Sequence, residues 1–126
     1  MSIPVDLAAL GVALGRHDTA YLLTAGEVRP HVVECFPELV EGVLVVTEPG
    51  RTARRVVADR PAATVLMPPR QAGGYTLIVD GEASVDEAGA LRLVPSHAVL
   101  HRAAGHATTA AVTGCGNDCL PLDPAP

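Results

Sequence analysis

The stretch YTLIVDGEASVDE, residues 75–87, decides how the rest of the chain can be arranged. It is expected to form one unusually long strand, because the apolar run LIV is followed by more strand-forming residues beyond Asp80 and Gly81. An acidic residue followed by a glycine in the middle of a strand indicates a bulge or a bend. A strand that bends at this point can serve two sheets of one barrel.

Five shorter strands are expected around this long one, each bounded by turn residues. They are AYLLT (20–24), RPHVVECF (29–36), VLVVTE (43–48), ATVLM (63–67) and a last strand that contains Leu91 and Leu93. Continuous apolar runs such as VLVV indicate strands that are covered on both faces. The pattern predicts a mainly β fold, a small barrel or sandwich with a few helices, in one domain that spans residues 1–126.

Residues 1–17 are expected to form an N-terminal helix. Leu7, Leu10 and Leu14 recur at helical spacing, Ser2 can cap the first turn, and Pro4 stands where a first-turn proline is tolerated.

The helix predictions continue further along the chain. GRTARRVVADR, residues 50–60, favours a second helix that Pro61 stops. Residues 96–112 favour a third helix, and residues 114–126 have the composition of a flexible tail.

Composition excludes some classes of function. The 126 residues carry a net charge of -5 and no lysine, so a pyridoxal phosphate Schiff base cannot form. The acidic balance argues against general nucleic-acid binding, and no apolar run approaches the roughly 20 residues of a membrane-spanning helix. Three cysteines, an odd number, with no export signal predict a cytoplasmic protein with reduced thiols.

The segment EPGRTARRVVADRP, residues 48–61, holds four of the nine arginines. It lies at a strand-to-helix junction, where free backbone N–H groups and the helix dipole favour an anion. Thr52 adds a hydroxyl, and Arg54 and Arg55 can grip a phosphate with their planar forks. The alternative is an ordinary solvated helix in which Arg55 and Asp59 form a weak surface pair.

The order of these features resembles the FMN-binding split β-barrel family, the pyridoxamine 5′-phosphate oxidase-like proteins. The likeness spans roughly residues 20–86. It rests on RPHVV at 29–33, on the helix from Thr52 to Pro61, and on VDGEA at 79–83.

The resemblance implies a six-stranded split barrel, a homodimer, and FMN in the groove between the subunits. Two groups of cofactor-binding residues follow from it: Thr52, Arg54 and Arg55 at the phosphate, and His31, Val32, Val33 and Met67 along the flavin ring. It also implies a flavin-dependent oxidoreductase acting on a small molecule, with no nucleic acid or membrane partner.

Two departures from the family pattern narrow this expectation. Val56 stands where many members have asparagine, which leaves a deazaflavin or a cofactor-free barrel as alternatives. True pyridoxamine phosphate oxidases are longer and carry C-terminal arginine and histidine residues that this chain does not convincingly match. We therefore expect no vitamin B6 oxidation.

A second hypothesis is a non-catalytic barrel that binds a metal. His97 and His101 are four residues apart, which places both rings on one face of the expected helix, and Cys115 and Cys119 follow. Mixed histidine and cysteine ligands suit zinc. Cys35 is expected to be a small core residue rather than a nucleophile.

Overall fold

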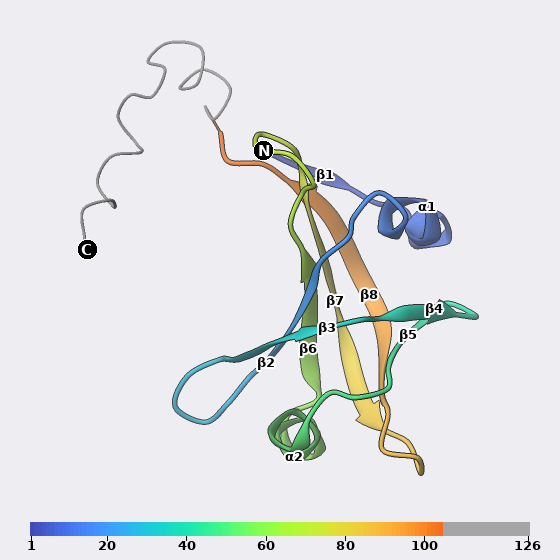
Figure 1. Ribbon diagram of the computed structural model, residues 1–126, viewed down its shortest axis with the longest axis vertical. Helices are drawn as coiled ribbons and strands as arrows, with labels where there is room; N and C mark the ends of the chain where they lie inside the picture. The colour runs from blue at the N-terminus through green and yellow to red at the C-terminus, as the bar shows by residue number, and fades with distance from the viewer. Residues whose placement is uncertain (105–126) are drawn as a thin grey trace.

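The computed structural model describes residues 1–104, which form one curled antiparallel sheet with short helices (Figure 1). The strands of this part of the chain are β1 (Ser2–Pro4), β2 (Ala20–Thr24), β3 (His31–Cys35), β4 (Glu38–Val40), β5 (Val43–Val46), β6 (Ala62–Met67), β7 (Thr76–Val85) and β8 (Leu91–His101). The helices are a 3₁₀ turn at Leu7–Ala9, α1 (Leu10–Leu14) and α2 (Arg51–Asp59). None of these helices is long and apolar enough to cross a membrane.

The sheet order is β3-β2-β6-β7-β8-β5-β4, and β1 pairs with the far end of β8. The two ends of this order, β3 and β4, are joined by only Phe36 and Pro37. Because so short a link must connect the two edges, the sheet curls on itself into a half-barrel, as Figure 1 shows. This confirms the expected mainly β barrel with a few helices.

All six expected strands are present, as β2, β3, β5, β6, β7 and β8. The described chain has two more strands, β1 and β4, of three residues each. Both are too short to leave a periodic signal in the sequence, and each is defined by its pairing with a distant or neighbouring strand.

The long strand β7 bends where its sequence indicated. Its pairing with β8 shifts in register between Asp80 and Gly81, and Ser96 of β8 is left without a partner. A side chain at Gly81 would collide with the backbone carbonyl of Val94 and lie 3.0 Å from the Cα of Pro95. Pro95 is tolerated in the middle of a long strand because it stands at this bulge, where no ladder hydrogen bond is required of it.

The core fills the inner, concave face of the sheet. Its fully buried side chains include Leu22, Val65, Leu77, Val79, Leu91 and Leu93. Helix α1 contributes Leu10 and Ala13 to this core, and helix α2 contributes Ala53 and Val57. Both helices therefore pack on the inside, which leaves the outer face of β2, β6, β7 and β8 without a covering element among residues 1–104.

The expected helix over residues 1–17 is present only at residues 7–14, as the 3₁₀ turn and α1. Residues 2–4 form β1 instead, because β8 offers them a free edge at residues 99–101. The helical part begins only after Asp6, whose carboxylate accepts a hydrogen bond from the backbone N–H of Ala8 at 3.1 Å.

The third expected helix is also wrong where the structure describes it. Residues up to His101 continue strand β8, which runs along the whole length of β7. Pairing with this long neighbour overrides the helical spacing of the sequence. The rest of that segment, and the tail at residues 114–126, lie outside the described residues.

Candidate functional site

Helix α2 begins without a capping side chain. Gly50 takes the N-cap position with φ of 91°, a left-handed conformation that glycine adopts without strain, and it has no side chain to bond the first N–H groups. The helix is nine residues long, and Ala53 and Val57 anchor its inner side. The first turn of α2 therefore keeps unpaired backbone donors on a firmly held helix.

The three α2 residues expected at a phosphate differ in their surroundings. Thr52 and Arg54 are half-buried and Arg55 is exposed. The Arg54 Nη1 donates a long hydrogen bond of 3.4 Å to the carbonyl of Gly89, in the turn between β7 and β8. The Arg55–Asp59 pair does not form in the described structure, since the ion pair of Asp59 is with Arg60, at 4.0 Å.

The expected ring-lining residues of β3 do not share one face. His31 and Val33 are half-buried on the side of the buried Cys35, whereas the side chain of Val32 is 52% exposed on the other side. The Nδ1 atom of His31 is buried and has no hydrogen-bond partner within residues 1–104. An unsatisfied buried polar atom costs about 1–3 kcal/mol, so this nitrogen marks a place where a partner is missing.

A second unsatisfied atom lies directly across the hairpin. Thr24 of β2 is the cross-strand partner of His31, it is 2% exposed, and its Oγ1 has no partner in the described structure. We missed Thr24 from the sequence, although it is a polar residue at the inward position of the alternating strand AYLLT. The alternation of buried and half-buried positions along this strand is the signal that could have identified Thr24 as a buried polar residue.

Met67 is not brought together with these residues. It is 5% exposed in the core and lies at the opposite end of β6 from Ala63, the residue that pairs with Thr24. Met67 lies four positions along the strand from Ala63, about 13 Å away. Met67 instead lines a cavity at the junction of β3 and β4, together with Cys35 and His17.

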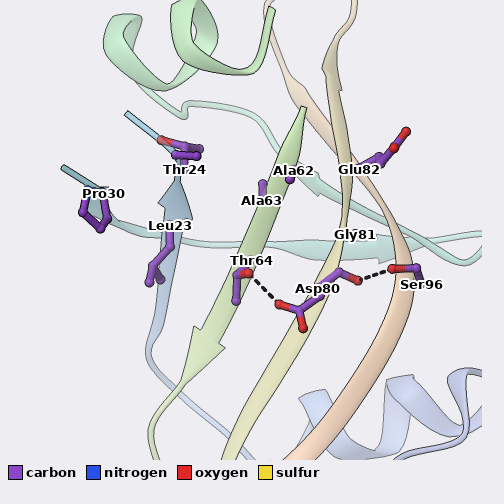
Figure 2. A pocket seen from close by; sticks show the side chains of 11 residues that line it. Leu23, Thr24, Pro30, Ala62, Ala63, Thr64, Asp80, Gly81, Glu82 and Ser96 are labelled. Atoms are coloured by element: carbon purple, nitrogen blue, oxygen red, sulfur yellow. Dashed lines mark hydrogen bonds between the residues drawn. The ribbon is translucent and has the colours of Figure 1, made fainter. Parts of the chain in front are cut away.

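An open hollow of about 550 Å³ lies on the outer face of the sheet, where β2, β6, β7 and β8 run side by side (Figure 2). Asp80 is its central polar residue, and Figure 2 shows the side chains of Thr64 and Asp80 pointing toward one another. The hydroxyl of Thr64 donates to Asp80 Oδ1 at 2.6 Å, and the hydroxyl of Ser96 donates to the backbone carbonyl of Asp80 at 3.3 Å. In the sequence, Asp80 indicates only a bend, because its partners Thr64 and Ser96 are brought to it by the pairing of the strands.

No family model matches the chain. Two curated relatives, uncharacterized proteins of Mycobacterium bovis and Mycobacterium tuberculosis, are each 37% identical over 132 residues, which covers 92% of this chain and 93% of theirs. The chain belongs to the same family as these mycobacterial proteins.

Solved structures share the fold of this chain. A candidate pyridoxamine 5′-phosphate oxidase of Listeria innocua has a TM-score of 0.63 at 15% identity, over 77% of this chain and 98% of its own. General Stress Protein 26 of Bacillus anthracis has a TM-score of 0.62 at 16% identity, over 75% and 92%. An FAD-binding protein of Mycobacterium smegmatis has a TM-score of 0.58 at 13% identity, over 81% and 100%. The fold is the split barrel of pyridoxamine 5′-phosphate oxidase-like proteins, as the sequence resemblance predicted.

Cys35 of this protein is a core residue, as expected. It is 2% exposed, and its burial, aided by the negative charge of Glu34, raises the pKa of the thiol to about 11. At neutral pH the thiol stays protonated, and a protonated thiol is a poor nucleophile.

The metal hypothesis finds no support in the described part of the chain. Residues 1–104 hold no group of three or more histidine, cysteine, aspartate or glutamate side chains that could bind a metal. His101 shares a hydrogen bond with Ser2 at 3.0 Å, and His97 Nδ1 lies 3.8 Å from Asp80 Oδ2. Cys115 and Cys119 lie outside the described residues, so the full ligand set stays a prediction.

Proposed function

We propose that the protein binds FMN at the start of helix α2 and uses it in an oxidoreductase reaction on a small molecule, in the cytoplasm. The observation that carries the proposal is the uncapped start of α2, with Thr52, Arg54 and Arg55 in its first two turns. The FAD-binding protein of Mycobacterium smegmatis, which has the same fold, supports a flavin as the ligand.

The start of α2 suits a phosphate for two reasons. Its free N–H groups and the positive end of the helix dipole both favour an anion. Long side chains on a helix lean toward its N-terminus, so Arg54 and Arg55 lean back toward the same place. Arg54 uses one donor on the Gly89 carbonyl, and a guanidinium has five N–H donors, so others remain for a ligand.

When bound, FMN supplies hydride or single-electron transfer. The chain has only to hold the phosphate, exclude water from the ring and offer hydrogen bonds to its polar edge. The buried, unpaired Nδ1 of His31 is suited to the last task, because a partner there would remove the cost of leaving it unsatisfied.

The outer face of the sheet supports a homodimer. Tyr21, Leu66, Ile78 and Val99 lie in register across β2, β6, β7 and β8. These four half-buried side chains, here called the apolar row, are covered by neither helix of the described chain. A second copy that packs on the apolar row would remove it from water.

The phosphate assignment is tested by comparing FMN with riboflavin, which lacks the phosphate. Arg54→Ala combined with Arg55→Ala removes two charge-assisted contacts, so FMN affinity should fall by about 100-fold while riboflavin affinity changes little. Flavin fluorescence titration measures both. Arg60→Ala, just beyond the last residue of α2, is the matched control and should leave both affinities unchanged.

Three results contradict the proposal in different ways. Unchanged FMN affinity in the double variant shows that the phosphate lies elsewhere. An equal loss of riboflavin shows that the arginines support the fold or the ring. No binding of FMN, FAD or riboflavin to the wild type rejects the flavin site, whereas tighter FAD than FMN binding changes the cofactor and keeps the flavin proposal.

A further inference from the structure

A second hollow, of about 310 Å³, lies where the chain leaves α1 and meets the loop between β6 and β7. Two of its lining residues, Arg16 and Arg70, are exposed arginines, and it is here called the arginine hollow. It shares no lining residue with the hollow around Asp80, and no residue of α2 lines it. The arginine hollow is therefore a separate place in the molecule.

The arginine hollow carries positive charge, although the whole chain has a net charge of -5. Arg102 adds to this charge, because its Cζ lies 4.6 Å from the ring centroid of Tyr75, another lining residue. Within residues 1–104 the only ion pair that Arg16, Arg70 and Arg102 form is that of Arg70 with Asp18. Three positive charges beside one carboxylate attract an anion to this place.

Arg70 is held in place with donors left available. Its Nε lies 3.0 Å from Asp18 Oδ2, and its Nη2 donates to the carbonyl of Gly15 at 2.9 Å. These two contacts fix the plane of the guanidinium, and the bond to Gly15 keeps Arg70 beside Arg16, the next residue of the chain. The Nη1 of Arg70 has no partner in the described chain, so its two N–H groups can donate to a ligand.

His17, which also lines the arginine hollow, gives a separate indication that negative charge is favoured there. Its Nδ1 lies 2.8 Å from the carbonyl oxygen of Ala13, and its Nε2 lies 3.1 Å from that of Tyr75. A neutral imidazole donates from one nitrogen only, so the doubly protonated ring is the form that satisfies both contacts. The neighbouring carboxylate of Asp18 is already paired with Arg70. An anion bound in the hollow would favour the cationic ring.

Much of the remaining lining of the arginine hollow is apolar. Pro69, Leu100 and the phenol ring of Tyr75 contribute to it, and Leu100 also packs against the core. Arginine side chains bind carboxylates through paired N–H donors. Two arginines beside an apolar wall therefore fit a molecule with an anionic group at one end and a small hydrocarbon body at the other.

We propose that the arginine hollow binds a small organic anion, a carboxylate with an apolar body. The carboxylate accepts hydrogen bonds from Arg16 and from Nη1 of Arg70. The hydrocarbon part packs against Pro69 and Leu100. This site uses none of the residues assigned to the flavin phosphate, and it stands whether or not the protein binds a flavin.

Four probes test the proposal: benzoate, benzyl alcohol and benzylamine, which have nearly the same shape and different charge, and inorganic phosphate. Each is titrated into ¹⁵N-labelled full-length protein at pH 7 and constant ionic strength, without added flavin. Benzoate should bind saturably and shift the backbone amide signals of Arg16, His17 and Tyr75. The alcohol and the amine should bind at least about tenfold more weakly, because neither offers a negative charge to the arginines. Phosphate has the charge without the apolar body, so it should also bind more weakly than benzoate.

Arg16→Gln removes one positive charge and keeps a long polar side chain. The Arg16 side chain makes no hydrogen bond or ion pair within residues 1–104, so the variant should fold as the wild type does. It should weaken benzoate binding at least about tenfold, because a charge-assisted hydrogen bond is lost. Arg29→Gln removes the same charge from an exposed position between β2 and β3, outside the lining of the arginine hollow, and should leave the affinity unchanged.

The proposal is overturned if benzoate causes no saturable shifts, if benzylamine or phosphate binds as well as benzoate, or if Arg16→Gln keeps full affinity. It is also overturned if the saturable shifts lie at residues 50–55, because benzoate then binds at the start of α2 instead. Since the titration contains no flavin, each of these results leaves the FMN proposal as it stands. A failure of FMN binding likewise does not affect the result with benzoate.

Discussion

The two faces of strands β2, β6 and β7 differ in what their side chains do. On the inner face Leu22, Val65 and Val79 are fully buried, and their burial stabilises the barrel. On the outer face the same strands present the apolar row and, next to it, the polar row that runs from Thr64 through Asp80 to His97. Because side chains alternate along a strand, one set of residues secures the fold and its immediate neighbours remain available for binding.

The largest effect is expected at Gly81, the point where the inner face meets the backbone of β8. In Gly81→Ala the new methyl group collides with the Val94 carbonyl, so β7 and β8 must separate. The free energy of unfolding should fall by about 3 kcal/mol. Urea unfolding measures it, with Ser84→Ala on the exposed face of β7 as the control. A loss no larger than that of the control would show that the bulge adapts easily.

The second largest effect is expected for a substitution on the outer face, and it concerns the dissociation constant of the proposed dimer. Ile78→Asp places a charge in the middle of the apolar row, and burying that charge against a second copy is unfavourable. The dissociation constant of the proposed dimer should rise at least about 100-fold while the monomer stays folded, since the side chain is half-exposed.

Sedimentation velocity over a concentration series measures this change. Ser84→Asp, on the exposed outer side of β7 beyond the apolar row, should dimerise as the wild type does. A wild-type protein that stays monomeric at all concentrations would remove the dimer from the proposal.

The smallest effects have opposite signs at two threonines on opposite faces of the sheet. Thr24→Val replaces an unpaired buried hydroxyl by a methyl group, so the unliganded protein should gain about 1 kcal/mol. Thr64→Val removes the 2.6 Å hydrogen bond to Asp80 and should cost about 1 kcal/mol. Urea unfolding without ligand compares them. If Thr24→Val destabilises the protein, the hydroxyl has a hydrogen-bond partner in solution.

The inner face could be predicted from the sequence, because local patterns determine it. AYLLT alternates buried and half-buried residues as β2 does, and Asp80-Gly81 marked the bulge. The helix at residues 50–60 was also correct to within a residue at each end. Its arginines were located correctly, although sequence alone could not show that Arg54 turns toward Gly89.

The outer face could not be predicted, because its clusters depend on the register between strands. Thr64 and Asp80 are sixteen residues apart and meet only through the pairing of β6 with β7. Strand β1 was missed for a similar reason, since its partner lies at residues 99–101 and its own sequence contains a proline. Met67 was placed near the cofactor by resemblance, and the structure places it in the core at the other end of β6 from Ala63, the residue that pairs with Thr24.

The pairing of β1 with the end of β8 also has a consequence for the order in which the chain folds. Ser2–Pro4 meet their partners only when residues 99–101 have been synthesised, and the ammonium group of Met1 donates to the carbonyl of Arg102 at 2.9 Å. Closing so long a loop is entropically costly and slow. Residues 2–4 are therefore synthesised well before their partners and are among the last of the described residues to reach their places, and the edge of β8 stays exposed until they arrive.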